Sequence, residues 1–185
     1  MEVKVGNFRV PIPQNEPVYS YAPGTTDRDK LAHAINELRN QQIEIPMIID
    51  GKEVRTGDKV EIHCPHNHSQ VLGHYYRGDK KEINMAVDSC MESWKSWSNM
   101  SWEYRAGVFL KAADLLTGPY RYIVNAAAML AHSKNPFQSE IDAVCELADF
   151  WRFNAFYMQE IYDNQPESAP LVWDRMDYRS LEGFV

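Results

Sequence analysis

The stretch "SKNPFQSEIDAVCELADFWRFN", residues 133–154, decides how this chain folds. From Phe137 to Tyr162, apolar residues recur at alternating spacings of four and three, which predicts one long helix after the turn "HSKNP". This first stripe consists of Phe137, Ile141, Val144, Ala148, Trp151, Ala155, Met158 and Tyr162. A second stripe lies nearly opposite and consists of Glu146, Phe150, Phe153 and Tyr157.

A helix that is apolar on two faces either packs between two layers or lines a cavity with one of its faces. The second stripe begins with a carboxylate, that of Glu146, which favours the cavity interpretation. Aromatic residues at helical spacing are nevertheless more often packing residues. From the residues alone, core packing is therefore the first interpretation of Phe150 and Phe153, and a cavity is the second.

Three more helices are expected before the long one. Asp79 and Glu82 form the pattern of a capping box, and the apolar spacing after them continues to Trp97. Ser101 is expected to cap the next helix, "WEYRAGVFLKAADLL", which Gly118 ends. A third helix runs to about residue 131. Residues 79–165 are thus predicted to form a layer of four helices.

The remaining parts of the chain are less helical. Residues 1–46 are predicted to form an extended, proline-containing arm and a short helix capped by Asp27. In residues 47–78, "MIIDGKEV" has the pattern of a β-hairpin, and "KVEIH" and "QVLGHYY" predict two strands around the loop "CPHNHS". This region is expected to be a small antiparallel β section. Residues 166–185 indicate a linker and the start of a further strand, so the fold class is α/β.

Composition excludes several classes of function. The 185 residues are 44% hydrophobic and 24% charged, as in ordinary soluble domains, and the net charge of −7 makes a nucleic-acid partner unexpected. No apolar run reaches the roughly 20 residues that span a bilayer. The first residues, with Glu2 and early prolines, do not have the pattern of a targeting peptide. Cys64, Cys90 and Cys145 are widely spaced, which predicts free thiols and a cytoplasmic protein.

The most metal-like cluster consists of His63, Cys64, His66, His68 and His74. It contains neither a Cys-x-x-Cys pair nor two histidines four apart on a helix, and Pro65 and Asn67 fit an ordinary turn. The sequence also has no glycine-rich phosphate loop and no Gly-x-Ser-x-Gly motif. No catalytic, cofactor-binding or metal-ligating residue is therefore assigned from local chemistry.

The order of these elements resembles the N-terminal part of the aldehyde dehydrogenase superfamily. Within that superfamily, the phrases are similar to those of the delta-1-pyrroline-5-carboxylate dehydrogenases, which oxidise L-glutamate gamma-semialdehyde. Besides the stretch at residues 133–154, the phrases are "NEPV" (15–18), "GKEVRTG" (51–57), "PHNH" (65–68), "FLKAADLLTGP" (109–119) and "LEGFV" (181–185).

The resemblance implies NAD-dependent oxidation of glutamate semialdehyde to L-glutamate, the last step of proline breakdown, by an enzyme that is a homo-oligomer at full length. In that family the NAD site, the glutamate base and the cysteine nucleophile follow the strand that "EGFV" begins. The resemblance therefore implies that the 185 residues alone are an inactive fragment. Because the long helix borders the aldehyde tunnel in the family, Glu146, Phe150 and Phe153 become candidates for the tunnel wall. The alternative is a non-catalytic binding or assembly module derived from the same family.

Overall fold

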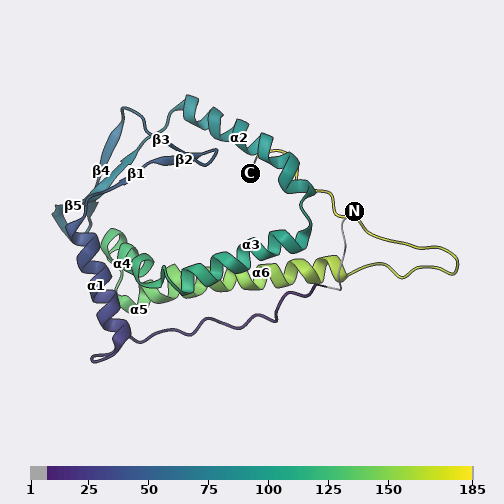
Figure 1. Ribbon diagram of the computed structural model, residues 1–185, viewed down its shortest axis with the longest axis horizontal. Coiled ribbons are helices and arrows are strands. Elements are labelled where there is room, and N and C mark those ends of the chain that lie inside the picture. The colour runs from purple at the N-terminus through teal and green to yellow at the C-terminus, as the bar shows by residue number, and fades with distance from the viewer. Residues whose placement is uncertain (1–7, 185) are drawn as a thin grey trace.

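The computed structural model describes residues 8–184 and confirms the mixed α/β class. Its strands are β1 (Ile43–Ile45), β2 (Met47–Ile49), β3 (Lys52–Val54), β4 (Lys59–Cys64) and β5 (Asn67–Tyr76). Its helices are α1 (Thr26–Asn40), α2 (Lys80–Asn99), α3 (Trp102–Thr117), α4 (Arg121–His132), α5 (Pro136–Ser139) and α6 (Glu146–Asp163), with a π-helical turn, η1 (Glu140–Cys145), between the last two. Figure 1 shows α3 and α6 side by side, with the arm before α1 running along them.

The helices do not all join one layer. Helix α6 packs on α3, η1 packs on α4, and α1 covers α4, whereas α2 crosses the other side of the molecule and contacts β2 (Figure 1). The indole Nε1 of Trp94 on α2 donates to the Leu181 carbonyl oxygen at 2.7 Å. One helical layer therefore consists of α1, α3, α4 and the long helix (α5–η1–α6), and α2 lies outside it.

The two predicted hairpins are present. Strands β2 and β3 pair in antiparallel fashion through Asp50 and Gly51, whose φ angles of 54° and 67° are the positive values that a type I′ turn requires. Strands β4 and β5 also pair antiparallel, and Cys64 is opposite Asn67. The connection between them is therefore a two-residue turn, shorter than the expected loop "CPHNHS".

Strand β1 was not expected, and it pairs in parallel with β5, so the β region is not wholly antiparallel. Three residues before a proline carry no periodic signal, and they form a strand only because β5 offers a long edge. Ile43 is opposite Gly73, where an added Cβ would overlap the Ile43 carbonyl oxygen. The close approach of these two backbones therefore requires glycine.

Helix caps follow the sequence in two cases and differ in one. The capping box is confirmed, because Asp79 Oδ1 accepts from the Lys81 N–H at 2.7 Å and Glu82 Oε2 accepts from the Asp79 N–H at 3.0 Å. Ser101 precedes α3 as expected but makes no side-chain cap bond. The prediction of Asp27 as a cap was wrong: Thr25 caps α1, and Asp27, in the first turn, accepts the Tyr122 hydroxyl.

The predicted long helix spans residues 136–163, with Asn135 as its cap. The spacing did not indicate η1, because a π turn adds one residue to a turn without changing the polarity of any residue. The strand expected at "LEGFV" is not seen in the described part of that stretch, because residues 164–184 form neither helix nor strand; Val185 lies outside the described residues. None of the helices within residues 8–184 is long and apolar enough to cross a membrane.

Candidate functional site

A cavity of about 600 Å³ lies between the second stripe of the long helix and the N-terminal arm. Its wall includes Glu146, Phe150, Phe153 and Tyr157 from α6 and Asn15, Glu16 and Val18 from the arm. The three residues predicted as tunnel candidates are therefore neighbours in one wall. Among the described residues Phe150 is 57% exposed, so it does not belong to the core that residues 8–184 form. The first stripe, by contrast, buries Val144, Ala148 and Ala155.

The charge of this cavity is negative. Glu16, Glu146 and Asp149 line it, and no lysine or arginine does. Glu146 has no hydrogen-bond or ion-pair partner among the described residues, whereas Asp149 accepts two hydrogen bonds from the arm. A cavity with aromatic walls and an unpaired carboxylate attracts a cationic group and disfavours a phosphate.

Behind the cavity wall lies a buried polar cluster around Arg121 and Glu140, which are 1% and 0% exposed. The Arg121 guanidinium donates to the Glu140 carboxylate, to Glu16 Oε1 at 2.6 Å and to the Pro17 carbonyl at 2.7 Å. Glu140 Oε2 accepts further from the Tyr21 hydroxyl at 2.6 Å. Because Glu16 and Tyr21 belong to the arm, this cluster joins the arm to α4 and η1.

The cluster is charged at neutral pH. Burial by itself would raise the pKa of Glu140, but hydrogen bonds from Arg121, Tyr21 and the Tyr19 N–H outweigh burial and lower it. Burial would likewise lower the pKa of Arg121, and its bonds to the carboxylates of Glu140 and Glu16 raise it. Each group therefore stabilises the charged form of the other.

Sequence reasoning missed this cluster. Single charged residues on helices are normally solvated, so Arg121 gave no signal. Glu140 did carry one: it lies three residues after Phe137 and four before Val144, which is the spacing of the buried stripe. A carboxylate at such a position predicts a buried polar partner.

Cys145 borders both the cavity and the cluster, but it is not an activated nucleophile. Its Sγ lies 3.7 Å from Glu140 Oε1. Burial, together with the negative charge of Glu140, raises the pKa of this thiol to about 12. Since the thiolate is the reactive form, Cys145 is inert at neutral pH.

The histidine cluster is part of the β4–β5 hairpin. His63 Nδ1 lies 2.9 Å from the His68 carbonyl oxygen, and His66 lies between Cys64 Sγ at 3.2 Å and Ser133 Oγ at 2.9 Å. No group of three or more potential ligands is arranged for a metal ion within residues 8–184. These contacts tie the hairpin turn to the end of α4.

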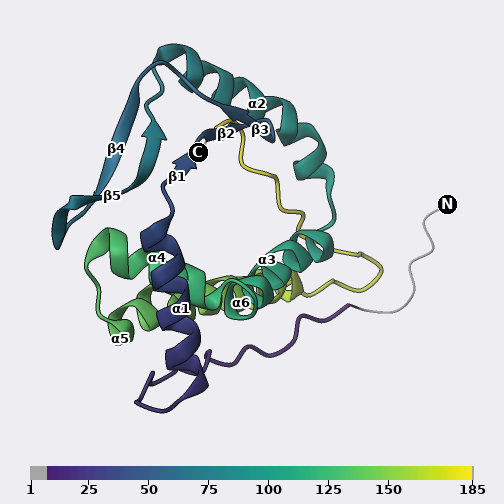
Figure 2. The ribbon, with the colours of Figure 1, turned by 60° about the vertical axis from the view of Figure 1, so that its left-hand side comes forward.

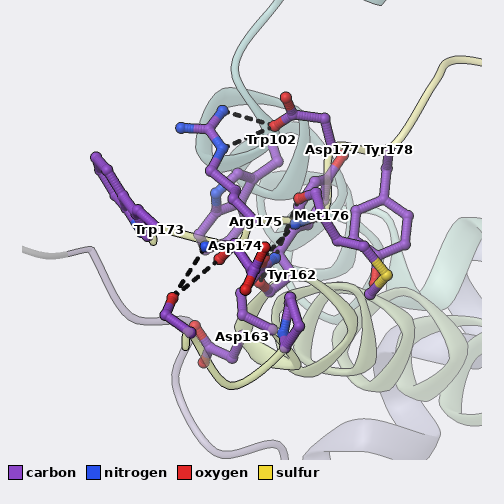
Figure 3. Close-up of a pocket in the computed structure, with 12 residues that line it drawn as sticks. Trp102, Tyr162, Asp163, Trp173, Asp174, Arg175, Met176, Asp177 and Tyr178 are labelled. Atoms are coloured by element: carbon purple, nitrogen blue, oxygen red, sulfur yellow. Dashed lines mark hydrogen bonds and ion pairs between the residues drawn. The ribbon is translucent and has the colours of Figure 1, made fainter. Parts of the chain in front are cut away.

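A second cavity, of about 510 Å³, lies where the segment after α6 folds back (Figure 3). Several polar contacts of this segment are internal: Arg175 pairs with Asp177 at 2.6 Å, and the Met176 N–H donates to Gln165 Oε1 at 2.8 Å. Ser168 Oγ accepts from the Asp174 N–H at 3.0 Å. Because these groups satisfy one another, this cavity offers less to a ligand than the one beside Glu146.

Comparisons with known proteins bear on the family and the fold of the chain. The family model "Aldehyde dehydrogenase family" matches residues 53–181. The delta-1-pyrroline-5-carboxylate dehydrogenase of Agaricus bisporus is 44% identical over 184 residues, which are 98% of this chain and 34% of the relative. The mitochondrial delta-1-pyrroline-5-carboxylate dehydrogenase of Dictyostelium discoideum is 42% identical over 95% of this chain and 32% of its own length.

Solved structures give the same result. The delta-pyrroline-5-carboxylate dehydrogenase from Mycobacterium tuberculosis superposes with a TM-score of 0.95 at 40% identity, over 98% of this chain and 34% of that one. A structure of that enzyme bound with NAD has a TM-score of 0.94 at 41% identity, over 97% and 34%. The chain thus spans about a third of the length of these relatives.

Proposed function

The chain belongs to the aldehyde dehydrogenase family, and we propose that it supplies the aldehyde-binding wall of an NAD-dependent dehydrogenase. Its substrate would be L-glutamate gamma-semialdehyde, which forms from 1-pyrroline-5-carboxylate, and its product L-glutamate, in proline catabolism. The names and the 40–44% identity of the relatives support this substrate. The observation that carries the proposal is the unpaired Glu146 in a cavity walled by aromatic side chains.

The chemistry of the substrate fits that wall. Glutamate semialdehyde carries an α-ammonium group, which simple aliphatic aldehydes lack. Glu146 is exposed among the described residues, so water satisfies its carboxylate until a cationic group replaces that water. Glu146 would accept a charge-assisted hydrogen bond from the ammonium group. One such bond contributes about 1.5–3 kcal/mol, or roughly ten- to a hundred-fold in selectivity.

The role of these residues is binding and orientation, not bond making. Cys145 stays protonated at neutral pH, and the Cys64 thiol is buried and bonded to His66. Neither has the exposed thiolate that attack on an aldehyde requires. The third cysteine, Cys90, is exposed but does not line this cavity, so the 185 residues by themselves are expected to have no turnover.

NAD would be bound by other parts of the enzyme, because the described residues do not fit its diphosphate. A binding site for a diphosphate needs a glycine-rich turn that leads from a strand into a free helix N-terminus. The strand-to-helix connection in residues 8–184 runs from β5 to α2, and there the Asp79 carboxylate already occupies the helix N-terminus. A second negative group at that position would be repelled.

The test uses a chimera in which these 185 residues replace the matched residues of the Agaricus bisporus relative. NADH formation from glutamate semialdehyde is expected with the chimera and not with the 185-residue chain. Glu146→Gln should lower kcat/KM for glutamate semialdehyde about ten- to a hundred-fold while changing that for pentanal little. The matched control is Glu160→Gln, on the same helix but outside the cavity.

Equal losses for the two aldehydes would contradict the role of Glu146. A chimera that oxidises pentanal but not glutamate semialdehyde would contradict the proposed substrate. Turnover by the 185-residue chain alone, abolished by heating, would contradict the restriction of these residues to binding.

Assembly and location complete the proposal. We expect the whole enzyme to be a homo-oligomer, which sedimentation of the chimera would test. A cytoplasmic location stays a prediction, and the Dictyostelium discoideum relative is named mitochondrial. A fluorescent fusion that colocalised with mitochondria would contradict it.

A further inference from the structure

The arm runs beside the long helix without a strand partner, as Figure 2 shows from a second direction. Three of its backbone N–H groups, those of Val10, Glu16 and Tyr19, donate instead to side chains of the long helix. The Val10 N–H donates to Gln159 Oε1 at 2.6 Å, and the Tyr19 N–H to Glu140 Oε1 at 3.0 Å. These contacts lie far apart on one helical segment, so they fix which arm residues face the cavity.

Between these contacts, Glu16 anchors the arm through its carboxylate. Oε1 accepts from Arg121 Nη1 at 2.6 Å and Oε2 accepts from Arg152 Nη1 at 2.6 Å. Both bonds are charge-assisted, and the Glu16 side chain is only 11% exposed. Although Glu16 borders the cavity, its charge is therefore already paired.

The arm also donates two hydrogen bonds to the carboxylate of Asp149. Asn15 Nδ2 donates to Oδ2 at 2.9 Å, and the Glu16 N–H donates to Oδ1 at 2.8 Å. Glu146 lies one turn earlier on the same wall and makes no such bond within the described residues. Of the three carboxylates in the cavity, one is thus left for a ligand.

We propose that the arm decides which carboxylate receives the substrate's ammonium group, with Asn15 and Asp149 as positioning residues. This inference rests on the proposed function. If Asn15 did not hold Asp149, two carboxylates three residues apart would compete for one cation. An ammonium group held by Asp149 would lie about 4.5 Å further along the helix axis, and the aldehyde would move with it. Displacements of this size strongly reduce productive binding.

The test is Asn15→Leu in the same chimera. Asn15→Leu frees Asp149 Oδ2 for the ammonium group, while the Glu16 N–H still holds Oδ1. KM for glutamate semialdehyde should therefore change little while kcat falls about ten-fold, a larger fall than that of kcat for pentanal. The double variant Asn15→Leu with Asp149→Asn should restore kcat, because the competing charge is gone. The matched control is Gln14→Leu, the same change on the adjacent arm residue, which does not border this cavity.

Either of two kinetic results would overturn the inference: a kcat for Asn15→Leu no lower than that of Gln14→Leu, or a double variant no better than the single one. If Glu146→Gln leaves selectivity intact, the proposed function fails instead. Hydrogen exchange of the chimera gives a readout independent of activity. The Glu16 amide should exchange at least about ten-fold faster in Asp149→Leu than in Gln14→Leu, and unchanged exchange would also overturn the inference.

Discussion

Replacement of Arg121 by methionine would measure what the buried cluster contributes to docking of the arm. Methionine is a similarly long, flexible side chain without the guanidinium donors. The change removes the bonds to Glu140, Glu16 and the Pro17 carbonyl, and the stacking on Tyr19, whose ring centroid lies 3.6 Å from the guanidinium carbon. Glu140, which is fully buried, would then keep only neutral donors.

The expected loss can be worked out by two routes. If Glu140 stays charged, breaking a buried pair costs about 3–5 kcal/mol. If Glu140 instead takes up a proton at pH 7, protonation of a carboxyl group whose ordinary pKa is 4.5 costs about 3.4 kcal/mol, because each of the 2.5 pH units between 4.5 and 7 costs about 1.36 kcal/mol. The chain adopts whichever of these two states costs less free energy, so Arg121→Met should weaken docking of the arm by about 3 kcal/mol. Protection of the arm against hydrogen exchange should therefore fall by roughly a hundred-fold.

The pH dependence separates this explanation from a loss of packing. In the unmutated chain the pKa of Glu140 is lowered below its ordinary value of 4.5. The stability that the charged Glu140 contributes is therefore fully present above pH 4.5 and is lost only as the pH falls through the folded-state pKa. In Arg121→Met that pKa would be raised. The penalty should then shrink as the pH falls from 7 towards 4.5, by about 1.4 kcal/mol per pH unit. Between pH 7 and pH 5, the difference between variant and parent should thus decrease by about 2.7 kcal/mol.

The assay is hydrogen exchange by mass spectrometry on peptides that cover residues 17–24 in the chimera, corrected for intrinsic exchange rates. The double variant Arg121→Met with Glu140→Gln should regain most of the protection and show no such pH dependence. Arg179→Met, which removes an exposed pair with Glu182, is the control and should change protection by less than about 0.5 kcal/mol. A loss below about 1 kcal/mol, or one that does not change with pH, would refute the reasoning.

Two further predictions concern other parts of the chain. Cys90 is exposed, while Cys64 and Cys145 are buried. Ellman's reagent at pH 8 should therefore modify one thiol of the folded 185-residue chain quickly, and all three after denaturation. Fast modification of two thiols would contradict the burial of Cys64 or Cys145. Gly73→Ala should lower the melting temperature by the equivalent of about 1–3 kcal/mol, because the new Cβ meets the Ile43 backbone, whereas Gly57→Ala, with open space around it, should have little effect. Equal melting temperatures for the two glycine variants would contradict the close pairing of β1 with β5.

The helix residues Glu146, Phe150 and Phe153 could be found from the sequence, although their role could not. The spacing of these three residues placed them on one face of a helix, and the resemblance to a family made a tunnel wall an alternative of similar weight to core packing. The arm residues Asn15 and Glu16 could not be assigned to the same cavity. They are more than 130 positions from Asp149, and nothing in their local sequence indicates which helix they touch.

The sequence by itself determined the features that depend on neighbouring residues. The long helix, the Asp79 capping box and the Asp50-Gly51 turn follow from periodicity and from local side-chain-to-backbone bonds, so a short window of sequence contains their cause. Only the tertiary structure decided the pairing of β1 with β5, the pairing of Arg121 with Glu140 and the docking of the arm. Each of these depends on a partner distant in sequence, and a buried charge is stable only where the fold brings its partner within hydrogen-bond distance.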